Sequence, residues 1–384
     1  MGDSPNHHSV SQGYLKAFND GQGIIVYDTT ERTLPELLRQ IRDPRIETKV
    51  KCLAAEIDYN TRETKNGPDD SFEQMLWPFE NDYPRVRKAV RSRQALSDEQ
   101  LDSLARFAGA QSARVNRMVL VDPMQQNREQ AAAVIRQFKP EMTEEQISEM
   151  TDAMSGDLVN TDVPPTPKNI ALDAVPLMID FDMDMFRFMF KSIVYSNARE
   201  FVTSDAPVVF VDPARFPVPQ RSFPRLSETI EVTFPLYRRA CLVMAWQPLR
   251  SQFQADEAMV STINARTANH SRKHVFATNT GAQVDRNRNA RDFHDMAVRL
   301  GTPLASALAR EEPATEEETA RYRHAMATLG IPPEMARGEV EAIGSRFALP
   351  WLHAKKASRN DWAAKKPSAD VGAHRGRRPS QGGA

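Results

Sequence analysis

The amino-terminal pattern of apolar and polar residues predicts a short helix, a turn and a strand. Tyr14, Leu15 and Phe18 stand at helical spacing, so a helix would place these three apolar side chains on one face. The Gly-Gln-Gly sequence at 21–23 is typical of a turn, and the β-branched and aromatic run at 24–27 indicates a strand. We therefore expect a helix–turn–strand unit at the start of the chain.

Capping boxes predict the starts of three further helices. A Ser or Thr followed three residues later by Gln can exchange hydrogen bonds with the backbone at a helix start. This pattern occurs at Ser71–Gln74, Ser97–Gln100 and Thr143–Gln146, and the first helix should bend at Pro78, which removes a backbone donor. Apolar periodicity predicts other helices at 33–41, 181–196 (apolar almost all round), 255–269, 290–300 and 316–329.

Short apolar runs in the second half of the chain predict a small antiparallel sheet. Short turns join these runs, as is usual between antiparallel strands. The runs lie at 200–204, 207–211, 229–236 and 240–246, whereas the polar segment at 60–70 predicts a loop. The predicted fold class is α+β, predominantly helical, with a small antiparallel sheet between Glu200 and Trp246.

Composition divides the chain into a core and two carboxy-terminal segments. We expect an α+β core over 1–280, with a hinge near 160–168 where prolines cluster, and a weakly helical extension over 281–352. The tail at 353–384 carries eight Lys or Arg against two Asp, a local net charge of +6, so we expect a disordered basic tail. Such a tail could contact nucleic-acid phosphates, or it could be a solvated appendage.

Bulk composition argues against several classes of protein. The 384 residues carry 50 Lys and Arg against 51 Asp and Glu, a formal net charge of −1, which argues against polyanion binding by the whole molecule. No apolar run approaches the roughly 20 residues of a membrane span, and the polar start does not resemble a secretory signal. Two cysteines, Cys52 and Cys241, cannot build a disulfide scaffold. We expect a cytoplasmic protein without a membrane partner.

Several short motifs follow one another along the first 280 residues. They are His-x3-Gln-x-Tyr-Leu-x2-Phe at 8–18, Glu-x6-Glu at 73–80, Gln-x2-Arg at 111–114, Thr-Ser-Asp-x-Pro-Val at 203–208, Pro-Leu at 235–236 and an asparagine at 264. This ordered set resembles a bacterial family, domain of unknown function 4238. Asn116 stands where that family often has a proline. The resemblance implies a domain over roughly residues 6–280 and implies no activity.

Two pairs of polar residues on predicted helices suggest ion pairing or ligand binding. Glu73 and Glu80 are two helical turns apart and share a face, where separate salt bridges are the simpler interpretation. Gln111 and Arg114 also share a face, and an arginine beside an amide suits a carboxylate or phosphate. A structural ion pair between Arg114 and one of the two glutamates is the alternative to anion binding.

His8 and Asp205 are the candidates for acid–base or metal chemistry. His8 precedes the first helix, where an imidazole could move a proton or could cap the helix. Asp205 ends an apolar strand at a tight turn, where a sheet would fix a catalytic carboxylate, although the same sequence suits an Asx-turn. His270 and His274 have zinc-like spacing, but no third ligand follows and a strand is expected after His274.

These residues define one hypothetical site with a divalent metal such as Mg²⁺. The assigned roles are catalysis for His8, Arg114 and Asp205, anion binding for Gln111 and Asn264, and metal binding for Glu73 and Asp205. The site would support metal-assisted phosphodiester hydrolysis, as in a nuclease-type toxin or phage-defence effector. The alternative is a non-catalytic binding or interaction module with a structural polar cluster. A catalytic site requires convergence on an accessible pocket, whereas a structural network leaves the groups buried and paired.

Overall fold

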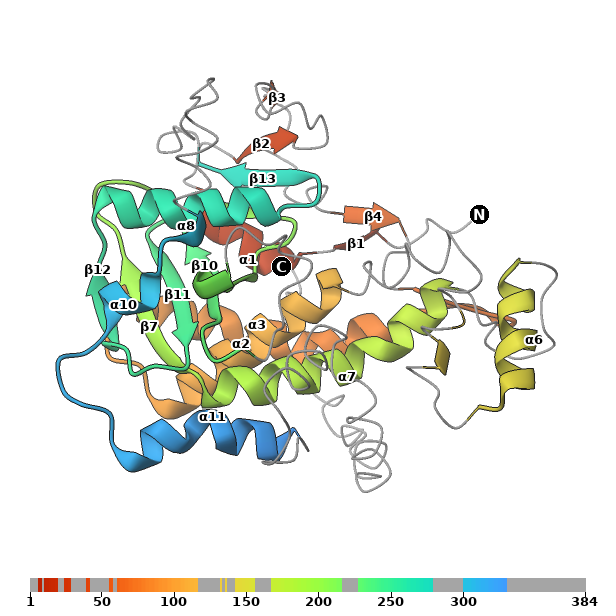
Figure 1. Cartoon of the computed structure of the whole chain (residues 1–384). Coiled ribbons are helices and arrows are strands. Elements are labelled where there is room, and N and C mark those ends of the chain that lie inside the picture. The colour runs from red at the N-terminus through yellow and green to blue at the C-terminus, as the bar shows by residue number, and fades with distance from the viewer. Residues whose placement is uncertain are drawn as a thin grey trace, which may run out of the picture.

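The computed structural model describes most of the chain between residues 61 and 278 and shorter pieces on either side (Figure 1). The described residues are 6–8, 10–19, 24–28, 39–41, 55–57, 61–116, 132, 135–136, 142–155, 167–215, 227–278 and 300–329. The predicted basic tail lies outside them, as do the turn at 21–23, the helix at 290–299 and the hinge residues 160–166. Among the described helices, none combines the length and apolar character that a bilayer crossing requires.

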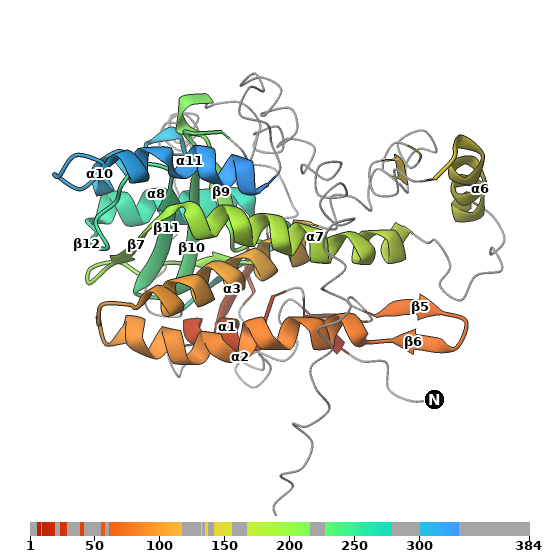
Figure 2. The same ribbon diagram turned by 90° about the horizontal axis from the view of Figure 1, so that it is seen from below.

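Three long helices form one layer of the molecule, where they run alongside one another (Figure 2). They are α2 (Ser71–Arg91), α3 (Asp98–Asn116) and α7 (Pro167–Phe188). Their apolar faces meet in one buried cluster, which also contains the amino-terminal aromatic residues. The shorter helices are α1 (Gln12–Leu15), the 3-10 turn η1 (Lys16–Phe18), α6 (Glu144–Ser155), the 3-10 turn η4 (Pro213–Arg215), α8 (Glu257–His270), α10 (Leu304–Leu308) and α11 (Glu316–Thr328).

A five-stranded mixed sheet packs against this helical layer in the order β12-β7-β11-β10-β9. Its strands are β7 (Phe190–Tyr195), β9 (Val209–Val211), β10 (Glu231–Tyr237), β11 (Ala240–Ala245) and β12 (Gln252–Gln254). All its neighbours pair antiparallel except β12, which is parallel to β7. The α+β class and the mainly helical character predicted from the sequence are confirmed.

The remaining strands join the start of the chain to its middle. An antiparallel sheet has the order β3-β2-β13-β8, so the amino-terminal β2 pairs with β13 of the carboxy-terminal half. Two further antiparallel pairs are β1 with β4 and β5 with β6. The bounds are β1 (Asn6–His8), β2 (Ile25–Asp28), β3 (Arg39–Ile41), β4 (Ala55–Ile57), β5 (Arg62–Thr64), β6 (Gly67–Asp69), β8 (Thr203–Ser204) and β13 (His274–Ala277).

Strand β11 shows why the five-stranded sheet is covered on both faces. Leu242 and Met244 belong to the buried cluster of α2, α3 and α7, whereas Cys241 and Val243 belong to a second cluster with α8 and α10. Successive side chains of a strand point to opposite faces, so an unbroken apolar strand needs a covering layer on each side. The core is therefore a helix–sheet–helix sandwich (Figure 1).

Two buried tyrosines donate hydrogen bonds to backbone carbonyls near the end of strand β10. The Tyr14 hydroxyl of α1 donates to the Pro235 carbonyl at 2.6 Å, and the Tyr83 hydroxyl of α2 donates to the Leu236 carbonyl. The register of β10 shifts between Pro235 and Tyr237, and β9 pairs with β10 only as far as Thr233. Burial raises the pKa of both phenols, so they remain protonated hydrogen-bond donors.

Three predictions of secondary structure were wrong. Residues 39–41, predicted as the end of a helix, form β3; residues 62–69, predicted as loop, form the β5–β6 hairpin; and residues 190–195, predicted as helix, form β7. The hairpin follows from Asn66-Gly67, because Gly67 adopts a φ of 106° that other residues avoid. The helix before β7 ends where the Lys191 ammonium donates to the carbonyls of Arg187 and Met189.

Capping chemistry was predicted correctly at two of three helices. Ser97 and Gln100 exchange hydrogen bonds at the start of α3, and Thr143 and Gln146 do so before α6. The capping box at Ser71 was wrong, because Ser71 lies inside α2 and donates to the Asp69 carboxylate instead. Helix α2 continues through Pro78 and Pro84. The predicted helices at 255–269 and 316–329 correspond to α8 and α11.

Gly109 permits the close approach of α3 and α7. A Cβ atom at this position would lie 3.0 Å from Met183 Cγ and 3.2 Å from the Met183 backbone nitrogen. Backbone atoms cannot move aside as a flexible side chain can, so any larger residue would separate the two helices.

We expect Gly109→Ala to destabilise the fold although alanine is the better helix former. Overpacking typically costs about 1–3 kcal/mol, which outweighs the gain of about 1 kcal/mol in helix propensity. Urea unfolding followed by circular dichroism measures the difference. Gly13→Ala is the matched control, because its Cβ would meet Ser11 Oγ at an ordinary 3.7 Å. Equal stability of the Gly109→Ala and wild-type proteins would contradict the steric argument.

Candidate functional site

Helices α2 and α3 bring three of the predicted charged residues together. The Arg114 Nη2 atom lies 2.7 Å from Glu80 Oε1 and 3.9 Å from Glu73 Oε1. The arginine side chain is only 1% exposed, whereas each glutamate is 22% exposed. A buried guanidinium requires a nearby carboxylate, because an unpaired charge in a low dielectric is strongly destabilising. The two glutamates therefore share one arginine, as the structural alternative to anion binding predicted.

Gln111 connects this cluster to the first helix. Its side chain is 1% exposed, and its Oε1 atom accepts a hydrogen bond of 3.4 Å from the Ser11 backbone N–H. Ser11 is the residue at which α1 begins, so Gln111 helps to fix the start of the helix that carries Tyr14. The amide of Gln111 thus binds a backbone group of the chain itself.

The Asp205 carboxylate accepts three hydrogen bonds from the backbone of the turn between α8 and β13. Its Oδ1 accepts from the Arg272 N–H at 2.8 Å, and its Oδ2 accepts from the N–H groups of Lys273 at 2.7 Å and His274 at 3.0 Å. The Asp205 N–H in turn donates to the His274 carbonyl at 3.0 Å. Asp205 is 7% exposed, so these bonds form where water does not compete with them.

Arg272 links the Asp205 turn to the end of α3. The Arg272 backbone binds Asp205, and its guanidinium donates to the Val115 carbonyl at 3.4 Å. Val115 is the neighbour of Arg114 in the chain. The α2–α3 charge cluster and the Asp205 turn are therefore adjacent parts of one polar region.

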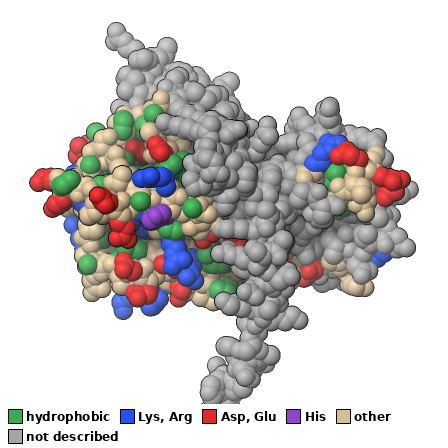
Figure 3. Space-filling view, turned by 60° about the horizontal axis from the view of Figure 1, so that its bottom comes forward, with side chains coloured by type: hydrophobic (Ala, Val, Ile, Leu, Met, Phe, Trp, Pro, Cys, Tyr) green, Lys and Arg blue, Asp and Glu red, His purple; other side chains and the backbone are tan. Residues whose placement is uncertain are grey.

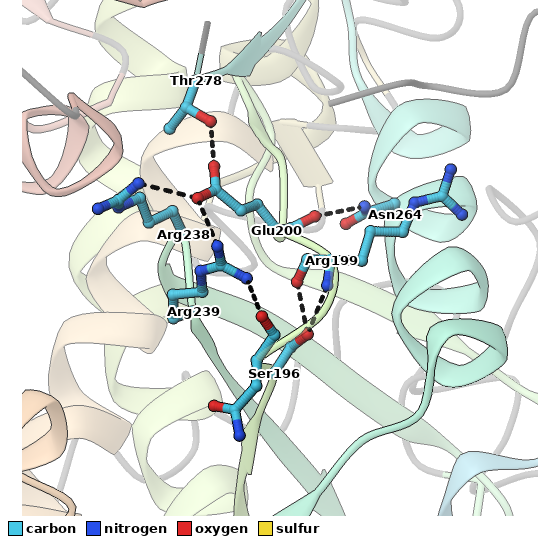
Figure 4. Close-up of polar contacts among 8 residues, drawn as sticks. Ser196, Arg199, Glu200, Arg238, Arg239, Asn264 and Thr278 are labelled. Atoms are coloured by element: carbon cyan, nitrogen blue, oxygen red, sulfur yellow. Dashed lines mark hydrogen bonds and ion pairs between the residues drawn. The ribbon is translucent and has the colours of Figure 1, made fainter. Parts of the chain in front are cut away.

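Asn264 lies in a separate network around Glu200 (Figure 4). Its amide donates to the Glu200 carbonyl at 2.9 Å and accepts from the Val202 N–H at 3.0 Å, which ties α8 to the segment before β8. The buried Glu200 carboxylate pairs with Arg238 at 2.8 Å and Arg239 at 3.2 Å and accepts from the Thr278 hydroxyl. These contacts give Asn264 a structural role, and its role toward an anion stays a prediction.

The histidines considered from the sequence form no metal site in the described part of the chain. His8 is the last residue of β1 and pairs with Ala55 of β4; its proton-transfer role stays a prediction. His270 ends α8 and His274 begins β13, so the two do not share a helix face, as the sequence suggested. Among the described residues, no three His, Cys, Asp or Glu side chains group in a way that could hold a metal ion.

Sequence reasoning missed a buried ion pair on the other face of the sheet. Arg266 of α8, 0% exposed, lies 2.8 Å from Glu231 of β10. The Glu231 carboxylate also accepts from the N–H groups of Leu304 and Ala305, and Arg266 donates to the carbonyls of Leu300 and Thr302. The local signal was a glutamate at the start of a mainly apolar strand.

Comparison with known proteins identifies the family of this chain, and that family has no assigned activity. Residues 6–281 match the family model described as protein of unknown function, DUF4238. No curated protein and no solved structure matches the chain.

We expect Asp205→Asn to destabilise the fold by about 2 kcal/mol or more. One side-chain atom would become an NH₂ group facing a backbone N–H, and hydrogen bonds to a charged acceptor contribute about 1.5–3 kcal/mol each. Chemical denaturation measures this loss. The control is Asp256→Asn, because the exposed Asp256 caps α8 through one bond to the Met259 N–H and asparagine caps equally well. Similar small losses in both variants would contradict a structural role for Asp205.

Proposed function

We propose that this chain, which belongs to the DUF4238 family of proteins of unknown function, is a binding or interaction module whose buried polar cluster is structural. The observation that carries the proposal is the Asp205 carboxylate, whose two oxygens accept three backbone N–H groups. These oxygens are directed at the Arg272–His274 backbone, so the carboxylate holds the turn between α8 and β13.

The α2–α3 cluster supports the same proposal. Arg114 is buried against Glu80, so its guanidinium serves a carboxylate of the chain rather than a phosphate of a substrate. An arginine that clamps a substrate needs to be reachable from solvent, which a side chain with 1% exposure is not. The burial of Arg114, Gln111 and Asp205 against partners within the chain supports a structural network.

Metal-assisted phosphodiester hydrolysis is the competing hypothesis. It requires Glu73 and Asp205 to hold one divalent ion, Arg114 to clamp the phosphate and His8 to move a proton. Such an arrangement would weaken the three backbone hydrogen bonds of Asp205, because the ion would draw on the same two oxygens. That cost must be recovered from metal binding, so the two hypotheses differ in how divalent ions affect stability.

Two conservative variants of α2 separate the hypotheses. In the structural interpretation, Glu80→Gln removes the 2.7 Å ion pair of a buried arginine and lowers stability by about 3 kcal/mol, whereas Glu73→Gln weakens an interaction at 3.9 Å and costs about 1 kcal/mol or less. Thermal unfolding in EDTA and in Mg²⁺ or Mn²⁺ measures both effects. We expect divalent ions to leave the difference between the variants unchanged.

The opposite result would favour the hydrolase. A metal at 100 times its dissociation constant stabilises a fold by about 2.7 kcal/mol. If Mg²⁺ or Mn²⁺ stabilises the wild type, and Glu73→Gln abolishes that effect while folding normally, Glu73 is a metal ligand. If the wild type then cleaves a DNA or RNA substrate and His8→Ala does not, the hydrolase hypothesis replaces the present proposal.

A further inference from the structure

Four arginines gather at the surface where α2 ends and β10 turns into β11. Arg91 and Arg93 lie at the end of α2, and Arg238 and Arg239 form the turn between the strands. We call these four residues the arginine cluster. Burial raises the pKa of the neighbouring Tyr237 phenol, and the positive charges of all four arginines oppose that rise.

Direct contacts join the two halves of the arginine cluster. The Arg93 guanidinium lies 4.9 Å from the centre of the Tyr195 ring and donates to Asn197 Oδ1 at 2.5 Å. Arg239 donates to the Asn197 carbonyl at 2.8 Å. Asn197 thus contacts both arginines, and the Tyr195 ring lies beside the Arg93 guanidinium.

The positive charge of the cluster exceeds its local counter-charge. Within the described part of the chain, the carboxylate that pairs with the cluster is Glu200, which contacts Arg238 and Arg239 and is 3% exposed (Figure 4). Arg91 and Arg93 are exposed, and the side chains of Arg238 and Arg239 are 38% and 34% exposed. One buried negative charge beneath four accessible positive charges leaves an outward positive field.

On the face shown in Figure 3, acidic and basic side chains are interspersed across the described part of the molecule. The whole chain has a net charge of only −1. A local basic surface on a nearly neutral molecule is the arrangement expected where a polyanion binds at one place.

Arg93 is held in a backbone conformation that favours glycine. Its φ is 53°, and it follows Ser92, the C-cap residue of α2. Glycine is usual at this position, because a side chain in the left-handed region is strained. Arg93 offsets that strain through its contact with Tyr195 and its hydrogen bond to Asn197, and the residue remains exposed at the surface.

We propose that the arginine cluster binds the phosphodiester backbone of a nucleic acid. This inference rests on the proposed function, since it names the partner of the binding module. Guanidinium groups present paired donors that match phosphate oxygens, and four of them can contact successive phosphates. Tyr237, which is half-buried and directly precedes Arg238, favours a nucleic acid over an acidic protein segment, because bases stack on aromatic rings and carboxylates do not.

The test uses fluorescence anisotropy with labelled 20-nucleotide single-stranded DNA and RNA. The variant R91A/R93G removes two exposed cations, and a glycine relieves the left-handed strain at position 93, so we expect a thermal midpoint close to that of the wild type. Its affinity should fall at least tenfold, and the slope of log K against log salt should become shallower by about 0.7 for each phosphate that the variant no longer binds. Arg91→Glu gives the same test without any change at position 93.

The matched control is Arg85→Ala. Arg85 lies on α2, is 67% exposed, and pairs with Asp82 rather than with the arginine cluster. We expect it to bind both probes like the wild type. The proposal is overturned if the wild type does not bind, if Arg85→Ala loses as much affinity as R91A/R93G, if Arg91→Glu binds unchanged, or if poly-glutamate competes better than unlabelled nucleic acid.

Gel analysis of the recovered probe separates this inference from the proposed function. Intact probe with the expected loss of affinity in R91A/R93G supports both. Metal-dependent cleavage of the probe overturns the non-catalytic proposal, whatever the arginine variants do. If the probe stays intact and the arginine variants bind it like the wild type, only the proposal for the arginine cluster is overturned, because binding would then occur elsewhere.

Discussion

The backbone carbonyls of Pro235 and Leu236, near the end of β10, each accept a hydrogen bond from a buried tyrosine hydroxyl. Beyond Thr233, β10 has no pairing with β9, and its register against β11 shifts. Buried carbonyls without partners would cost about 1–3 kcal/mol each. The hydroxyls of Tyr14 and Tyr83 remove that cost only if α1 and α2 lie at one position against the sheet.

The position of these helices determines the rest of the polar region. Tyr14 stacks on Phe234 at 5.2 Å, Tyr83 stacks on Phe107 of α3 at 4.2 Å, and the Thr203 hydroxyl lies 2.6 Å from the Tyr14 oxygen. The rings therefore connect α1, α2, α3 and β8 to one strand. With α2 and α3 fixed in this way, Glu80 meets Arg114, and Gln111 meets the start of α1. The charge cluster depends on an aromatic core beneath it.

Local patterns predicted those features that local chemistry determines. The spacing of Tyr14, Leu15 and Phe18 predicted a helix that exists, and the capping boxes at Ser97 and Thr143 predicted two helix starts, because neighbouring residues make those bonds. The strand at 190–195 was missed because an unbroken apolar run fits a buried helix and a buried strand equally. Only pairing with β11 and β12, distant in sequence, decides between them.

The same distinction applies to the candidate site. The sequence placed Glu73 with Glu80 and Gln111 with Arg114 on shared helix faces, but the meeting of the two faces is a tertiary contact. For Asp205, a catalytic and a structural carboxylate have the same local sequence, and the three N–H donors come from residues about seventy positions later. The Glu231–Arg266 pair was not predicted for the same reason.

Burial divides the charges of this chain into two physical classes. Arg114, Arg266 and Glu200 are desolvated, so each must be paired or the fold loses several kcal/mol; their partners follow from stability alone. Arg91 and Arg93 are exposed, where an ion pair contributes about 0–1 kcal/mol and its absence costs little. Stability therefore explains the pairing of the buried groups and does not explain the gathering of exposed arginines around Tyr237. In the proposed role of the arginine cluster, a negatively charged partner would supply that interaction.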